Sequence, residues 1–185
     1  MTKQTKKSLA QIFEDRLVEG ALPGETEGFE KAERSEAARF MADAAATRKP
    51  GQPSLKLDTF ARGDRRRMRL AVVNDDMPFL VDSIAGAIAA HDIAIDRILH
   101  PVLRVSRDES GAVTEFGDTG EPESMVYIEM DRADARPRRE LVAELERNLR
   151  HVRFAVNDWR QMESAMRADS DTLNDDEGAA LLRWF

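Results

Sequence analysis

The spacing of apolar residues predicts alternating strands and helices between residues 66 and 156. An apolar run at residues 70–73, rich in the β-branched residue Val, is typical of a buried strand. Asn74, Asp75 and Asp76 follow it and favour a turn, because such side chains hydrogen-bond to the local backbone. Pro78 suits the first turn of a helix, where its missing N–H leaves no bond unmade. Helical spacing of apolar residues then predicts an amphipathic helix over residues 78–91.

The same reasoning predicts two more strands, a second helix and a short last strand. Residues 93–106 alternate between two faces as one long strand, in which Pro101 indicates a sheet edge or a bulge. Residues 124–131 also alternate, residues 137–150 have a helical apolar stripe, and residues 152–156 favour a strand. This order predicts an α+β fold of the ferredoxin-like βαββαβ type, with a four-stranded antiparallel sheet and two helices on one face.

Helical segments are predicted on both sides of this unit. Residues 8–19 and 25–47 have helical apolar spacing, so residues 1–50 are interpreted as an N-terminal helical extension. Residues 54–157, which begin with a short edge strand, form the predicted βαββαβ main domain. Residues 158–185 contain a helix, an acidic linker and an apolar helical start, from which we expect a longer protein that continues beyond them.

Composition narrows the classes of function. The 185 residues have a net charge of −7, which argues against nonspecific nucleic-acid binding. No apolar run approaches the ~20 residues of a membrane-spanning helix. The sequence has no Cys, so disulfides, thiolate metal sites and Cys nucleophiles are excluded. The first residues contain Lys but no apolar signal core, and we therefore expect a cytoplasmic protein with neither nucleic-acid nor membrane partners.

Signatures of catalysis are scarce in this sequence. No glycine-rich phosphate cradle is present, and His91, His100 and His151 have no further ligands at metal-motif spacing. We therefore predict no catalytic residue, no metal site and no cofactor for the fragment itself.

Two charged clusters leave alternatives open. Asp75, Asp76 and Asp82 have the carboxylate oxygens that hard cations prefer, but ending a strand and capping a helix is the favoured interpretation. Residues 65–67 are three consecutive Arg, and they favour a solvated strand end over an anion site.

Three separated motifs carry a family resemblance. Residues 73–84 read VNDDMPFLVDSI, residues 98–105 read ILHPVLRV and residues 123–130 read ESMVYIEM. In this order they resemble the N-terminal region of the large bacterial NAD-specific glutamate dehydrogenases, and the LLRW of residues 181–184 resembles the segment leading into the next region. The resemblance covers residues 55–185 and implies an ACT-like domain, the amino-acid-sensing βαββαβ module. It also implies a homo-oligomeric parent enzyme that oxidatively deaminates L-glutamate to 2-oxoglutarate and ammonia, with NAD as cofactor.

The resemblance places a candidate effector site in the turn between the first strand and the first helix of the ACT-like module. ACT modules carry an Asp, a Pro and usually a Gly in this turn, and Phe79 stands at the Gly position. Helix-start N–H groups would take the carboxylate of an amino acid, and Asp75 or Asp76 its ammonium. The implied effector-binding residues are Asn74, Asp75, Asp76, Met77, Pro78 and Phe79.

A second hypothesis follows from the bulk of Phe79, because its side chain fills space that a Gly leaves open. The domain would then be an architectural module without a ligand, which mediates self-association and contacts with other domains of the enzyme. Under either hypothesis the catalytic and NAD-binding domains are expected beyond residue 185.

Overall fold

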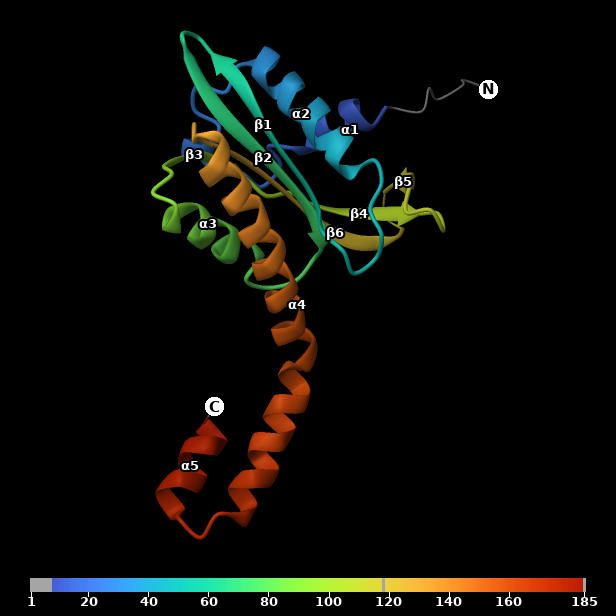
Figure 1. The fold of residues 1–185 in the computed structure, drawn as a ribbon. Helices are drawn as coiled ribbons and strands as arrows, with labels where there is room; N and C mark the ends of the chain where they lie inside the picture. Colours follow the sequence, from blue (N-terminus) through green and yellow to red (C-terminus); the bar gives the residue numbers. More distant parts are fainter. Residues whose placement is uncertain (1–7, 118, 185) are drawn as a thin grey trace, which may run out of the picture. The chain divides into compact units, whose positions relative to one another are not determined.

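Every strand of the described residues joins one antiparallel sheet (Figure 1). The structure is a computed structural model that describes residues 8–117 and 119–184, and the chain forms two compact units, Met1–Leu149 and Arg150–Phe185. The sheet has the order β1–β2–β6–β4–β5, and β3 also pairs with β6. The strands are β1 (Ser54–Arg62), β2 (Arg65–Asp75), β3 (Ile95–Leu99), β4 (Val102–Arg107), β5 (Val113–Phe116) and β6 (Glu121–Asp131).

The predicted long strand over residues 93–106 is in fact two strands. β3 pairs with residues 127–130 of β6, and β4 pairs with residues 121–124 of the same strand. Pro101 lies between them and has no N–H for a ladder, although its carbonyl oxygen accepts a hydrogen bond from the Met125 amide at 2.9 Å. The proline therefore divides the strand.

The predicted last strand at residues 152–156 is wrong, and with it the four-stranded βαββαβ topology. Helix α4 (Ala135–Thr172) continues through these residues. Val152 and Val156 are β-branched, yet they extend the helical spacing of the buried residues Leu145 and Leu149, and this pattern overrides the local preference for a strand. The sheet edge next to β2 is occupied instead by β1, which precedes it in the chain. The α+β class and the antiparallel sheet are confirmed.

One face of the sheet packs against helix α3 (Leu80–Ala90) and the first half of α4. Alternate residues of the central strands belong to this core, which contains Leu70, Val72, Leu80, Ile84, Val126, Ile128, Leu141 and Leu145. The two helices of the predicted module therefore lie on a single face, as expected.

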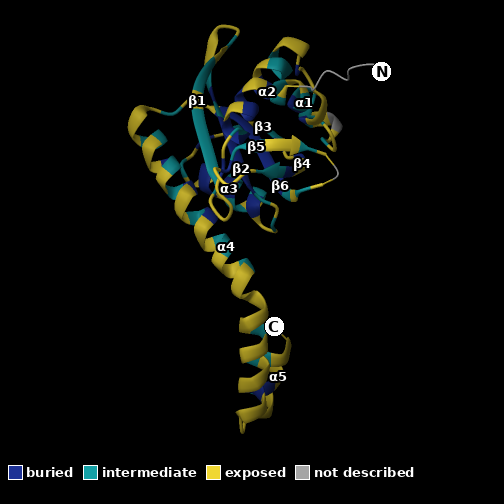
Figure 2. Cartoon of the chain, turned by 90° about the vertical axis from the view of Figure 1, so that its right-hand side faces the viewer, coloured by how far each residue is buried: buried dark blue, intermediate teal, exposed yellow. Residues whose placement is uncertain are grey.

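The other face of the sheet is covered by the N-terminal helices α1 (Leu9–Arg16) and α2 (Lys31–Ala45). A short 3-10 turn, η1 (Pro23–Glu25), lies between them. Phe13 and Met41 from these helices pack with Ala71, Met125 and Tyr127, which are the strand positions that alternate with those of the first core. The central strands β2 and β6 are largely buried, whereas β1 is intermediate in Figure 2 and the outer helix surfaces are exposed. Both faces of the sheet are thus interior.

The second unit consists of the later part of α4 and the helix α5 (Asp176–Trp184). The acidic tract expected to be a linker is mostly helical, and only residues 173–175 separate the two helices. Ala179 is buried within this unit, whereas Phe154 and Trp159 are exposed. No helix in the described part of the chain is long and apolar enough to cross a membrane.

Candidate functional site

The predicted effector residues form an exposed corner between β2 and α3. β2 ends at Asp75 as expected, but α3 begins at Leu80 rather than at Pro78. Phe79 is the N-cap residue and has a left-handed backbone, with φ of 68° and ψ of 5°, so the helical turn cannot extend back to the proline. The expectation that Asp76 lies at the helix cap is wrong, since α3 has no side-chain cap hydrogen bond.

Phe79 nevertheless behaves as a residue in a glycine position. Its positive φ is a conformation that glycine adopts freely and bulky side chains rarely adopt. The side chain is 65% exposed, so it covers the outside of the corner and is not packed into the core. Met77 is half-buried against the α3 core, and Pro78 is exposed.

Asp75 is held by groups from the loop that follows α2. Its Oδ1 accepts a hydrogen bond from Nη2 of Arg48 at 2.6 Å, and its Oδ2 accepts one from the Gly51 amide at 3.2 Å. Asn74 is buried, and its side chain donates to the backbone oxygen of Asp75 at 3.2 Å. Asp75 therefore anchors the connection between α2 and β1 to the end of β2.

A buried ion cluster lies directly beside Asp75. Glu123 of β6 is only 2% exposed and accepts hydrogen bonds from Arg48 at 2.6 Å and from Nε and Nη2 of Arg107 at 2.7 Å each. Burial alone would raise the pKa of Glu123, but the hydrogen bonds from Arg107 and Arg48 outweigh it and hold the pKa below its usual value. Burial likewise tends to lower the pKa of Arg48, yet the bonds to Glu123 and Asp75 leave it raised.

Asp76 takes part in a different hydrogen-bond network, on the other side of the sheet. Its Oδ1 accepts a hydrogen bond from the Ser124 hydroxyl at 2.6 Å, and the same hydroxyl lies 2.9 Å from Nε2 of His100. Loss of hydration lowers the pKa of His100, and the negative charge of Asp76 opposes this only in part. The three side chains connect the corner, β6 and the junction between β3 and β4.

The other candidate metal ligands, His91, His151 and Asp82, do not form a metal site with the residues of this corner. His91 contacts Glu144 at 3.0 Å, and His151 lies exposed on α4. Among residues 8–117 and 119–184, no three His, Cys, Asp or Glu side chains gather in a way that could hold a metal ion. Asp82 lies in the first turn of α3, where a carboxylate interacts favourably with the helix dipole.

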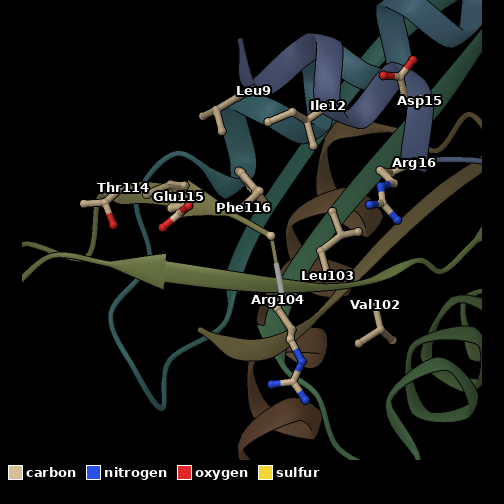
Figure 3. Close-up of a pocket in the computed structure, with 12 residues that line it drawn as sticks. Leu9, Ile12, Asp15, Arg16, Val102, Leu103, Arg104, Thr114, Glu115 and Phe116 are labelled. Carbon is tan, nitrogen blue, oxygen red and sulfur yellow. The ribbon is translucent and has the colours of Figure 1, made fainter. Parts of the chain in front are cut away.

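A larger hollow lies elsewhere on the first unit, between α1 and the strands β4 and β5 (Figure 3). It has a volume of about 690 Å³, and apolar side chains such as Leu9, Ile12 and Phe116 form part of its wall. None of the predicted effector residues lines it. No local sequence pattern predicts this hollow, because its walls come from segments about a hundred residues apart.

The sequence also missed Arg48, Arg107, Glu123, Ser124 and His100 as neighbours of the corner. Arg48 lies 27 positions before Asp75, and Glu123 lies 75 positions after Arg48, so no local pattern connects them. The predicted fold gives one indication of this arrangement: it places the strand that carries Asp75 next to the strand that carries Glu123.

Comparison with known proteins matches this architecture to one family. The family model "Glutamate dehydrogenase, ACT1 domain" matches residues 13–149, which include the end of α1 and all of α2 as well as the sheet. An NAD-specific glutamate dehydrogenase of Halomonas elongata is 34% identical over 111 residues, which cover 56% of this chain. The matched part spans only 7% of the length of that relative. The chain thus belongs to the family of glutamate dehydrogenase ACT1 domains.

Proposed function

We propose that this chain is a regulatory, amino-acid-sensing domain of an NAD-dependent glutamate dehydrogenase, with its ligand at the corner of residues 74–79. The observation that carries the proposal is an exposed aspartate next to the N-terminus of a helix that has no side-chain cap. The carboxylate of Asp76 is exposed, and the adjacent α3 begins without a side-chain cap. A free amino acid has the complementary pair, an ammonium and a carboxylate.

The two ends of an amino acid have separate partners in this arrangement. The N–H groups in the first turn of α3 would bind the carboxylate, because they have no intrahelical acceptor and lie at the positive end of the helix dipole. Asp76 would bind the ammonium. Asp75 is the weaker of the two predicted partners, because Arg48 and the Gly51 amide already engage its carboxylate.

The activity of the parent enzyme enters the proposal through the family. A protein built around this domain would oxidatively deaminate L-glutamate to 2-oxoglutarate with NAD, in the cytoplasm. NAD and the reacting groups would be bound by other parts of that enzyme. The chain itself would contribute effector binding and contacts with those parts.

Isothermal titration calorimetry with the common amino acids tests the sensing proposal. We expect at least one amino acid to bind to the full-length enzyme that contains this chain, and Asp76→Asn to weaken binding by about tenfold or more. Asp158→Asn is the matched control, because Asp158 is an exposed carboxylate in the second unit. Absence of heat at millimolar concentrations of every amino acid contradicts the proposal.

A second candidate function is a ligand-free module that mediates contacts between subunits. Two exposed apolar side chains favour it, Phe79 with 65% and Val102 with 46% of the side chain exposed. β1 and β5 also form the two ends of the strand order. Analytical ultracentrifugation distinguishes the functions: association that Phe79→Ser weakens supports contacts at the corner, and a monomer at all concentrations contradicts them.

A further inference from the structure

A second hollow, of about 580 Å³, lies at the opposite end of β2 from the effector corner. Three segments that are distant in sequence form it: the start of β2, the end of β6 and the turn between α3 and β3. Its lining residues are Arg65, Arg66, Arg67, Asp92, Ile93, Asp131 and Arg132. Four of the seven are arginines, on a chain whose net charge is −7.

Like charges lie close together in this hollow, at the end of two paired strands. β2 and β6 are antiparallel, and their last pair at this end is Arg67 with Asp131. Arg66 and Arg132 adjoin this pair in the sequence, and both line the hollow. Like charges in one place repel each other, and a bound anion relieves this repulsion.

The acidic residues nearby neutralise only part of the positive charge. Arg67 forms ion pairs with Asp131 and with Asp96, so its guanidinium is already compensated. In the described part of the chain, Arg65, Arg66 and Arg132 are exposed and take part in no ion pair.

Asp92 is the one remaining acid of the lining. It lies in the turn after α3 with a left-handed backbone, φ 56°. Together with Asp96, which pairs with Arg67, the four arginines and three aspartates leave an excess of one positive charge.

We propose that this hollow binds the phosphoryl group of a small phosphorylated metabolite. Guanidinium groups match phosphoryl oxygens because their planar N–H donors form paired, charge-assisted hydrogen bonds. The excess positive charge attracts an anion, and a phosphoryl group carries about one to two negative charges at neutral pH. Ile93 also lines the hollow, but it is 8% exposed and belongs to the core beneath, so the arginines would make the main contacts with a ligand.

This site is independent of the amino-acid corner. β2 runs from Arg65 to Asp75, and ten steps of about 3.3 Å separate the two sites by roughly 30 Å. A failure of amino acids to bind at residues 74–79 therefore leaves the phosphoryl site unaffected.

Calorimetric titration of the full chain with pyrophosphate and with ATP, at low ionic strength, tests the proposal. We expect both probes to bind, and the double variant Arg66→Gln/Arg132→Gln to weaken binding by about tenfold or more. Arg139→Gln is the control, since Arg139 is an exposed arginine outside the lining, and it should bind as the parent chain does. Tighter binding of ATP assigns the site to a phosphate ester, and equal binding assigns it to the phosphoryl group alone.

Asp92→Asn provides a test in the opposite direction. Asn tolerates a left-handed backbone well, so the fold is preserved while a negative charge leaves the hollow. Both probes should then bind about threefold more tightly. The proposal is overturned if neither probe binds at about 10 mM, if the Arg139 variant loses as much affinity, or if Asp92→Asn fails to tighten binding. Tighter, arginine-dependent binding of a single-stranded oligonucleotide also overturns it, because the ligand would then be a nucleic acid.

Discussion

Replacing Glu123 by Gln removes one buried negative charge beside the effector corner while keeping the shape of the side chain. In the native chain this carboxylate accepts three charge-assisted hydrogen bonds of 2.6 to 2.7 Å from Arg48 and Arg107. Both arginine side chains are less than a tenth exposed, so the substitution leaves the charge of Arg107 buried without its carboxylate, while Arg48 keeps its ion pair with Asp75. Breaking a buried ion pair on one side typically costs about 3–5 kcal/mol. We expect the free energy of unfolding to fall by that amount, out of a usual total of about 5–15 kcal/mol.

Urea denaturation followed by far-UV circular dichroism measures this loss. Tryptophan fluorescence is less suitable, because both tryptophans, Trp159 and Trp184, lie in the second unit. Glu140→Gln is the control: Glu140 is exposed on α4 and pairs with Arg136 at 2.9 Å, and its replacement should have no measurable effect. If Glu123→Gln unfolds at the same urea concentration as this control, the cluster does not stabilise the fold as argued.

Acid should weaken the same cluster in a defined direction. Because the folded-state pKa of Glu123 lies below its ordinary value of 4.5, the stabilisation is present above that pH and is lost as the pH falls below it. The parent chain should therefore lose stability between about pH 5 and pH 3 more steeply than Glu123→Gln. Parallel pH profiles of the two proteins would show that Glu123 contributes nothing to the acid response.

Three further predictions concern single residues. Phe79→Gly should raise the free energy of unfolding by about 1 kcal/mol, because it releases a strained backbone and removes an exposed ring, whereas Phe79→Val should lower it; urea titrations of both variants decide. His100 should titrate below its ordinary pKa of 6.5 by proton NMR, and stability should fall as the pH drops through 6.5 in the parent chain but less in His100→Gln. Tyr127, the only tyrosine, should resist ionisation at its ordinary pKa of 10.0, because burial and then Glu129 raise its pKa; the ultraviolet absorbance of the phenolate reports it, and a midpoint near 10.0 contradicts the buried placement. Stability should accordingly be present below pH 10.0 and be lost as the pH rises above it.

Local sequence patterns predict the elements whose structure depends mainly on residues that are close in sequence. β2, the turn after it and most of α3 follow from an apolar run, three polar residues and helical spacing, all within about 25 residues. Pro101 likewise predicts an interruption of the strand over residues 93–106, because a single proline is enough to break a strand ladder. The start of α3 is missed because the local residue pattern does not mark Phe79 as left-handed. Only the family resemblance, which places Phe79 at a glycine position, points to that conformation.

Long-range burial is the part that local patterns miss. Alternation along β6 indicates one apolar and one polar face, with Tyr127 and Glu129 on the polar one. In the structure both faces are buried, because α1 and α2 cover the second face and ion pairs compensate its charges. Glu129 accepts hydrogen bonds from Arg62 at 2.7 Å and from the Tyr127 hydroxyl at 2.9 Å. A buried glutamate cannot be recognised until its arginine is known, and Arg62 lies 67 residues away.

The two neighbouring aspartates of the corner show how strand geometry separates residues that a sequence motif treats as equivalent. Successive side chains of an extended chain point to opposite faces of a sheet. Asp75 therefore meets Arg48 on the side of α2, while Asp76 meets Ser124 on the side of α3. Both carboxylates accept hydrogen bonds within the fold, but only Asp75 is paired with a cation. Asp76 is the more exposed of the two, so it is the better of the two ammonium partners that the motif suggested. The face of the sheet to which each aspartate points depends on where β2 ends, and this direction determines which of the two carboxylates is available to a ligand.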